Sequence, residues 1–165
     1  MDMKIKNVLF ICFGNTARSP AAEGIAKALK RDKYPKELAE VTFDSAGFFN
    51  VYKTAQDETI DYVKENWDFD LSEHKGKVMD KELLQKQDLI LVMQTRHLKR
   101  LKRKFKSLED VHERAHLLLE FAEISGDANI DDPVNLDREK YYQLMKQVEK
   151  GVVKSIEKII ERNKK

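Results

Sequence analysis

The stretch VLFICFGNTARSP, residues 8–20, decides the fold of this chain of 165 residues. Its first four residues are all apolar, which is typical of a β-strand buried on both faces in a parallel sheet. A polar loop follows over 13–19. Pro20 then stands where the first turn of a helix tolerates a missing N–H, and Ser19 is the predicted helix cap. We therefore expect a buried strand, a loop and a helix in direct succession.

Strands and helices are predicted to alternate along the rest of the chain. Short apolar runs predict strands at 41–43, 89–93 and 116–119, and periodic apolar residues predict helices at 21–33, 54–67, 81–87, 95–105 and 138–162. This alternation favours an α/β fold, with an open parallel four-stranded sheet and helices on both faces. The chain has no internal repeat and no Pro/Gly/Ser-rich linker, so a single domain over 1–165 is expected.

Composition excludes several classes of protein. Hydrophobic residues make up 41% of the chain and charged residues 36%, which excludes a disordered or collagen-like chain. The 31 basic and 29 acidic residues leave a net charge of +2, so global charge gives no argument for nucleic acid. A single cysteine excludes an intramolecular disulfide, and no apolar run approaches the roughly 18 residues of a membrane span. We expect a cytoplasmic monomer without a nucleic-acid or membrane partner.

The loop after the first strand also carries a chemical pattern. Free N–H groups at a helix N-terminus, at the end of a parallel strand, form a ready site for phosphate. The same position stabilises a thiolate on Cys12, and Arg18 can grip two phosphate oxygens with its planar guanidinium. The combination predicts a phosphate-binding loop with covalent catalysis through a phosphocysteine. A lone cysteine at a strand end is more often a buried apolar residue, so the surrounding residues must decide.

Those surrounding residues resemble a known family. CFGNTARSPAAEG, residues 12–24, resembles the signature of the low-molecular-weight protein-tyrosine phosphatases. Other stretches resemble later elements of that family, in its order and over nearly the whole chain: Ser45–Gly47, the pair His74–Lys75, the strand 88–93 and Asp132–Pro133. The resemblance implies a hydrolase of phosphotyrosine in phosphorylated proteins, with no cofactor and no metal.

The resemblance also implies roles for individual residues. Cys12 is expected to be the nucleophile, Arg18 the phosphate clamp and Asp132 the general acid, whereas Asp131 is expected to be a solvated loop acid. Backbone N–H groups would cradle the phosphate, from Phe13, Gly14, Asn15, Thr16, Ala17 and Arg18.

Four residues are expected to support the loop: Asn15, Ser19, Ser45 and His74. Ser19 would donate a hydrogen bond to the Cys12 thiolate. Asn15 would adopt a left-handed backbone conformation, held by a network with Ser19, Ser45 and His74.

Two departures from the family pattern are visible. Ala17 stands where many members carry a second cysteine, so no disulfide can protect Cys12, and the further cysteines of the related arsenate reductases are absent. Val134 and Asn135 follow the Asp-Pro pair, where eukaryotic-type tyrosine phosphatases often have aromatic residues. One wall of the substrate slot is then left to aromatic candidates elsewhere: Phe13, Phe48, Phe49 or Tyr52.

Thr16 leaves the substrate class open. This position is usually a bulky aliphatic residue in tyrosine-selective members and is threonine in the protein-arginine phosphatases of the same family. A protein-arginine phosphatase is therefore the alternative function. A phosphate-binding module without turnover, or an arsenate reductase-like protein, is less favoured, because Cys12, Arg18 and Asp132 are intact and the cysteine relay is absent.

A dense run of basic residues covers 96–106. Such a run can bind nucleic acid or anionic lipid, but we interpret it as the solvated face of a helix whose apolar stripe contains Leu98, Leu101 and Phe105. The histidines of this region, His97, His112 and His116, are predicted to be surface or partly buried residues and not metal ligands.

Overall fold

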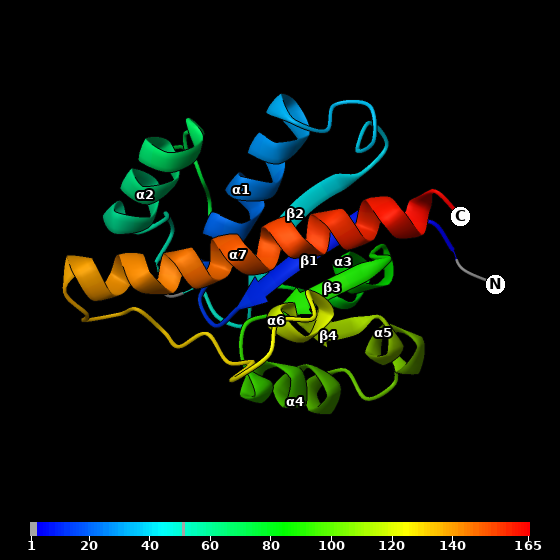
Figure 1. The fold of residues 1–165 in the computed structure, drawn as a ribbon. Coiled ribbons are helices and arrows are strands. Elements are labelled where there is room, and N and C mark those ends of the chain that lie inside the picture. The colour runs from blue at the N-terminus through cyan, green and yellow to red at the C-terminus, as the bar shows by residue number, and fades with distance from the viewer. Residues whose placement is uncertain (1–2, 51) are drawn as a thin grey trace.

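A parallel sheet with helices on both faces organises the computed structural model, which describes residues 3–50 and 52–165 (Figure 1). The strands are β1 (Asn7–Cys12), β2 (Thr42–Gly47), β3 (Leu89–Val92) and β4 (Ala115–Leu117). They lie in the order β2-β1-β3-β4, and every neighbouring pair is parallel. The predicted α/β fold with an open four-stranded parallel sheet is confirmed.

Seven helices pack around this sheet in the described residues. They are α1 (Arg18–Asp32), α2 (Asp57–Trp67), α3 (Lys81–Gln85), α4 (Thr95–Lys104), α5 (Glu109–Glu113), α6 (Leu118–Phe121) and α7 (Arg138–Asn163). None of them is long and apolar enough to cross a membrane.

Alternate side chains of β1 enter two different hydrophobic cores. Val8 and Phe10 pack with residues of α1 and α7, whereas Leu9 and Ile11 pack with residues of α4 and α5. Figure 1 shows α7 lying across the sheet beside α1 and α2, with α4 and α5 on the other side. Burial on both faces explains why the strand sequence is continuously apolar.

The structure corrects two predicted boundaries. Helix α1 begins at Arg18, and the predicted cap Ser19 lies inside the helix, because its hydroxyl bonds the side chains of Cys12 and Asn15 instead. The last strand ends at Leu117, and the residues 118–119 predicted to extend it begin α6. A short, wholly apolar run carries no periodicity that separates a strand from a buried helical turn. Helix α5 was not predicted, since five residues are too few to show a helical period.

Strand β1 lies at a reversal of the strand order. Its neighbours are β2 on one side and β3 on the other, so the chain leaves β1 in one direction and returns to pair on the opposite side. Open α/β sheets bind ligands in the crevice outside the carboxyl ends of strands at such a reversal. Residues 13–17 connect the end of β1 to α1 at this crevice.

Candidate active site

The backbone of the loop 13–17 turns carbonyl groups toward the surrounding chain. The Phe13 carbonyl accepts a hydrogen bond from the Phe48 N–H at 2.7 Å, and the Thr16 carbonyl accepts one from the Gln56 N–H at 2.8 Å. The N–H groups of 13–17 donate no hydrogen bond to any described residue. Free N–H groups concentrated before a helix N-terminus form a concave site for an anion.

Asn15 is the centre of the network that holds this loop. Its φ of 56° lies in the left-handed region, as predicted, and its side chain is fully buried. The amide donates to Ser19 Oγ at 2.8 Å and to Ser45 Oγ at 2.9 Å, and its oxygen accepts from the Lys77 N–H at 3.1 Å. His74 Nε2 lies 3.1 Å from the Asn15 carbonyl oxygen. The expected network of four residues is therefore assembled.

Cys12 ends β1 beneath the loop and is 2% exposed. Its Sγ lies 2.9 Å from Ser19 Oγ. Because the Asn15 amide already donates to that oxygen, the proton of the Ser19 hydroxyl is free to point at the sulfur. This contact fixes the position of the Cys12 sulfur beneath the loop.

Gly47 lets β2 approach the loop closely. A Cβ added at this position would lie 2.8 Å from the Asn15 nitrogen and 2.8 Å from the Phe13 carbonyl oxygen. Both neighbours are backbone atoms, so they cannot move aside without changing the loop. The end of β2 therefore fixes the shape of the loop 13–17 through direct backbone contact.

Arg18 is 2% exposed, and one nitrogen of its guanidinium, Nη1, holds it in place. Nη1 donates to Gln94 Oε1 at 2.7 Å and to the Ile130 carbonyl at 2.8 Å. Nε is buried and has no partner in the described residues, and Nη2 lies 3.9 Å from Asp132 Oδ2. The edge formed by Nε and Nη2 thus keeps two donors in the parallel arrangement that binds two oxygens of a phosphate.

A cavity of about 200 Å³ joins these groups. Its lining includes Cys12, Thr16, Arg18 and Asp132, so the predicted nucleophile, clamp and acid open into one pocket. The Asp132 side chain is 36% exposed, and its Oδ1 accepts from the Val134 N–H at 3.0 Å, which fixes the turn that carries it. Asp131 is exposed, as predicted.

The walls of this pocket combine aromatic and aliphatic side chains. Phe13, Tyr52 and Val134 line it, so two of the four aromatic candidates contribute. Phe48 is buried in the core, and Phe49 packs on Phe13 with ring centroids 5.1 Å apart. Val134, which follows the Asp-Pro pair, also lines the pocket, so this wall is not left to the aromatic residues alone.

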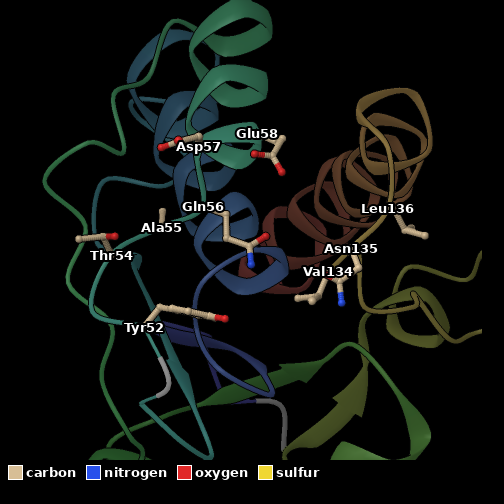
Figure 2. Close-up of a pocket in the computed structure, with 9 residues that line it drawn as sticks. All are labelled: Tyr52, Thr54, Ala55, Gln56, Asp57, Glu58, Val134, Asn135 and Leu136. Atoms are coloured by element: carbon tan, nitrogen blue, oxygen red, sulfur yellow. The ribbon is translucent and has the colours of Figure 1, made fainter.

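A second, larger cavity of about 450 Å³ adjoins the first. Tyr52 and Val134 line both cavities. Figure 2 shows Gln56 and Glu58 approaching this space from the start of α2, with Asn135 on the opposite side. The carboxylates in its lining make it the acidic side of the active-site mouth.

Three supporting residues were missed in the sequence. Glu23 accepts a hydrogen bond from Ser45 Oγ and so anchors the network of Asn15, and Gln94 holds Arg18. Tyr141, on α7, donates from its hydroxyl to Gln56 Oε1 at 2.9 Å. Burial raises the pKa of Tyr141, which keeps this hydroxyl a donor. Their partners lie far away in sequence, so no local pattern marks them.

His97 corrects the prediction for the histidines. It is 1% exposed, and neither ring nitrogen has a partner in the described residues. Burial, and then the charge of Arg18, lowers the pKa of His97 to about 3. A histidine within a basic run reads as a surface residue, but α4 turns this one against the Phe48 ring. No group of three or more potential metal ligands occurs within the ranges 3–50 and 52–165.

Comparison with known proteins places the chain in a family. Residues 7–165 match the model of the low molecular weight phosphotyrosine protein phosphatases. The protein-tyrosine-phosphatase Ptp of Acinetobacter johnsonii is 38% identical over 91 residues, which cover 55% of this chain and 58% of that protein. The protein-tyrosine-phosphatase Wzb of Escherichia coli is 29% identical over 135 residues, 82% of each chain. The chain belongs to the low-molecular-weight protein-tyrosine phosphatase family.

Solved structures agree with this fold. The low molecular weight protein tyrosine phosphatase from T. tengcongensis has a TM-score of 0.80 at 30% identity and covers 92% of this chain and 98% of its own. The YwlE arginine phosphatase from Geobacillus stearothermophilus has a TM-score of 0.77 at 23% identity, covering 93% and 92%. The second likeness concerns the fold alone.

Proposed function

We propose that this chain is a protein phosphatase that hydrolyses phosphotyrosine through a phosphocysteine on Cys12, with Asp132 as general acid. Family membership supports the reaction class. The observation that carries the proposal is the unpartnered Nε of Arg18, which faces the pocket beside Nη2. A buried guanidinium nitrogen without an acceptor is costly, and a phosphate in the adjoining pocket would supply that acceptor.

The proposed reaction has two steps. The Cys12 thiolate attacks phosphorus, while Arg18 and the free N–H groups of 13–17 stabilise the charge on the phosphoryl oxygens. Asp132 gives its proton to the departing phenolate oxygen. In the second step the Asp132 carboxylate takes a proton from water as the water oxygen attacks phosphorus, and the S–P bond breaks to release phosphate and the thiolate.

A second candidate, phosphoarginine hydrolysis, rests on Thr16. Its side chain lines the pocket beside Gly14, and its hydroxyl makes no hydrogen bond to the protein in the part of the chain described. A small side chain with a free hydroxyl leaves space beside the entering group and offers a polar partner to a guanidinium. A bulky aliphatic residue at this position would offer neither.

The test compares phosphotyrosine and phosphoarginine peptides of matched sequence. The proposal expects a larger kcat/KM on the phosphotyrosine peptide; a larger value on the phosphoarginine peptide would select the second candidate. Cys12→Ser serves as the control, because a serine hydroxyl is scarcely ionised at neutral pH and cannot replace the thiolate. Turnover by that variant at a rate near that of the wild type would refute the phosphocysteine.

We also infer a cytoplasmic monomer of one domain over 1–165, acting on phosphorylated proteins without a cofactor or metal. One cysteine, used at the proposed active site, suits a reducing compartment. Light scattering of the purified protein tests the monomer, and activity retained in the presence of a chelator tests the independence from metal.

A further inference from the structure

Helix α4 presents a cationic pocket at the edge of the active site. The pocket has a volume of about 190 Å³, and its lining includes Phe13 and four cationic side chains: Arg96, Lys99, Arg100 and Arg103. The helix reads TRHLKRLKRK and contains no acidic residue. A pocket with this lining concentrates positive potential at one place on the surface.

The four cations have no carboxylate partner. None of them lies within 4.0 Å of a carboxylate in the residues that the structure describes. Elsewhere on the surface such pairs are common, for example Arg138 with Asp61 at 3.0 Å. The pocket therefore retains charge that an external anion can neutralise.

Arg100 is held in place by aromatic rings. Its guanidinium carbon lies 5.8 Å from the ring centroid of Phe13 and 5.5 Å from that of Phe49. Stacking on rings restricts the guanidinium without using its hydrogen-bond donors. The pocket thus contains one cation, Arg100, that aromatic rings hold in position.

The cationic pocket and the phosphate pocket share a wall. Phe13 lines both of them. Arg96 also donates to Gln94 Oε1 at 3.2 Å, and the same oxygen accepts from Arg18. A polypeptide whose phosphorylated residue enters the phosphate pocket would bring its neighbouring residues to the cationic pocket.

We propose that this pocket is a docking subsite for a second anionic group of the same substrate chain, a carboxylate or another phosphate near the residue being hydrolysed. The inference rests on the proposed phosphatase function. A peptide is favoured over nucleic acid because the patch is small, shares a wall with the catalytic pocket and belongs to a chain whose net charge is only +2. The acidic pocket on the other side of Tyr52 would repel the same group, so the subsite also sets the direction of binding.

The test measures kcat/KM on three phosphotyrosine peptides, with neutral neighbours, acidic neighbours or a second phosphotyrosine. We expect wild type to prefer the anionic peptides to the neutral one by about tenfold at low salt, since electrostatic complementarity acts on association. Lys99→Gln with Arg103→Gln should reduce this preference to about twofold. A second phosphate preferred to carboxylates would identify a multiply phosphorylated chain as the source of the anion.

The matched control is Lys102→Gln with Lys106→Gln. It removes the same charge from neighbouring exposed positions that do not line the pocket, and it should keep the tenfold preference. An equal loss in both double variants, or no preference in wild type, would overturn the subsite. So would binding of an oligonucleotide that depends on Lys99 and Arg103 while the peptide preference stays fixed. Failure to hydrolyse even the neutral peptide counts against the proposed function, because the subsite affects only the ratio of kcat/KM between the anionic and the neutral peptides.

Discussion

The floor of the active site and its rim differ in how tightly they are held. On the floor, Cys12 and Arg18 are each 2% exposed, and their polar contacts run to buried groups such as Ser19 and the Ile130 carbonyl and to the partly buried Gln94. On the rim, Tyr52 is 56% exposed and Val134 is 40% exposed. A rigid floor suits chemistry that needs fixed distances, and an exposed rim suits contacts that vary with the substrate.

The rim is itself divided into two sides. The cavity beside α2 is lined by Asp57 and Glu58. The charged side chains that line the cavity beside α4 are all cationic, and the histidine in its lining, His97, is neutral at pH 7. A substrate that is acidic on one side of its phosphorylated residue would meet attraction in one direction and repulsion in the other.

Asp132→Asn should have the largest effect, because Asp132 is the one proposed proton donor where floor and rim meet. General acid catalysis contributes about 10²–10⁴-fold, so kcat/KM, which reports the step that expels the leaving group, should fall by that range on aryl phosphates whose leaving group needs a proton. The loss should shrink as the leaving group becomes more acidic. A series of substituted phenyl phosphates measures this trend, and an equal loss across the series would remove Asp132 from the acid role.

Arg18→Lys should reduce kcat/KM by about 10²–10³-fold, as expected for loss of a donor to transition-state charge. Lysine offers a point charge in place of the paired Nε and Nη2 donors, so inhibition by vanadate should weaken as well. Thermal melting of the variant serves as the control for folding, because Arg18 also bonds Gln94 and Ile130. Vanadate inhibition equal to that of wild type would show that the free edge of Arg18 does not bind the anion.

Thr16→Ile should act on the choice of substrate more than on the rate. We expect phosphoarginine activity to fall at least about tenfold, which corresponds to about 1.4 kcal/mol, while phosphotyrosine activity stays equal or rises. The measurement is the ratio of kcat/KM on the two peptides in both proteins. A fixed ratio would move selectivity away from Thr16 to the aromatic wall of Phe13 and Tyr52.

His97→Leu should change the pH dependence of stability. The folded protein keeps His97 neutral down to about pH 3, whereas an unfolded histidine gains a proton near its ordinary pKa of 6.5. Stability is therefore lost as pH falls through this interval, by up to about 1.4 kcal/mol per pH unit from this residue. Urea unfolding of both proteins between pH 6 and pH 4 tests this. If the two stability curves run parallel, His97 binds its proton equally well in the folded and the unfolded protein, which would contradict this prediction.

Local sequence patterns predicted the fold and the loop that carries Cys12 and Arg18, because strand, loop and helix follow one another within 8–20, whereas Asp132 was expected only from the family resemblance. Contacts between distant segments could not be predicted. Gln94 reaches Arg18 across 76 residues, and Glu23 supports Ser45 across 22. In the sequence, Gln94 and Glu23 look like any other polar residue, because only the folded sheet brings them next to their partners. The buried His97 was missed for a related reason, since packing of α4 against the sheet overrode its polar surroundings.

Gly47 has a consequence for the range of sequences that this molecule tolerates. The residue supplies no group proposed to react, yet any side chain there would meet the backbone of Phe13 and Asn15. A library containing all twenty residues at position 47 should retain almost none but glycine, as a library at the nucleophile retains only cysteine. The loop thus restricts the neighbouring strand sterically, at a position that supplies no reacting atom.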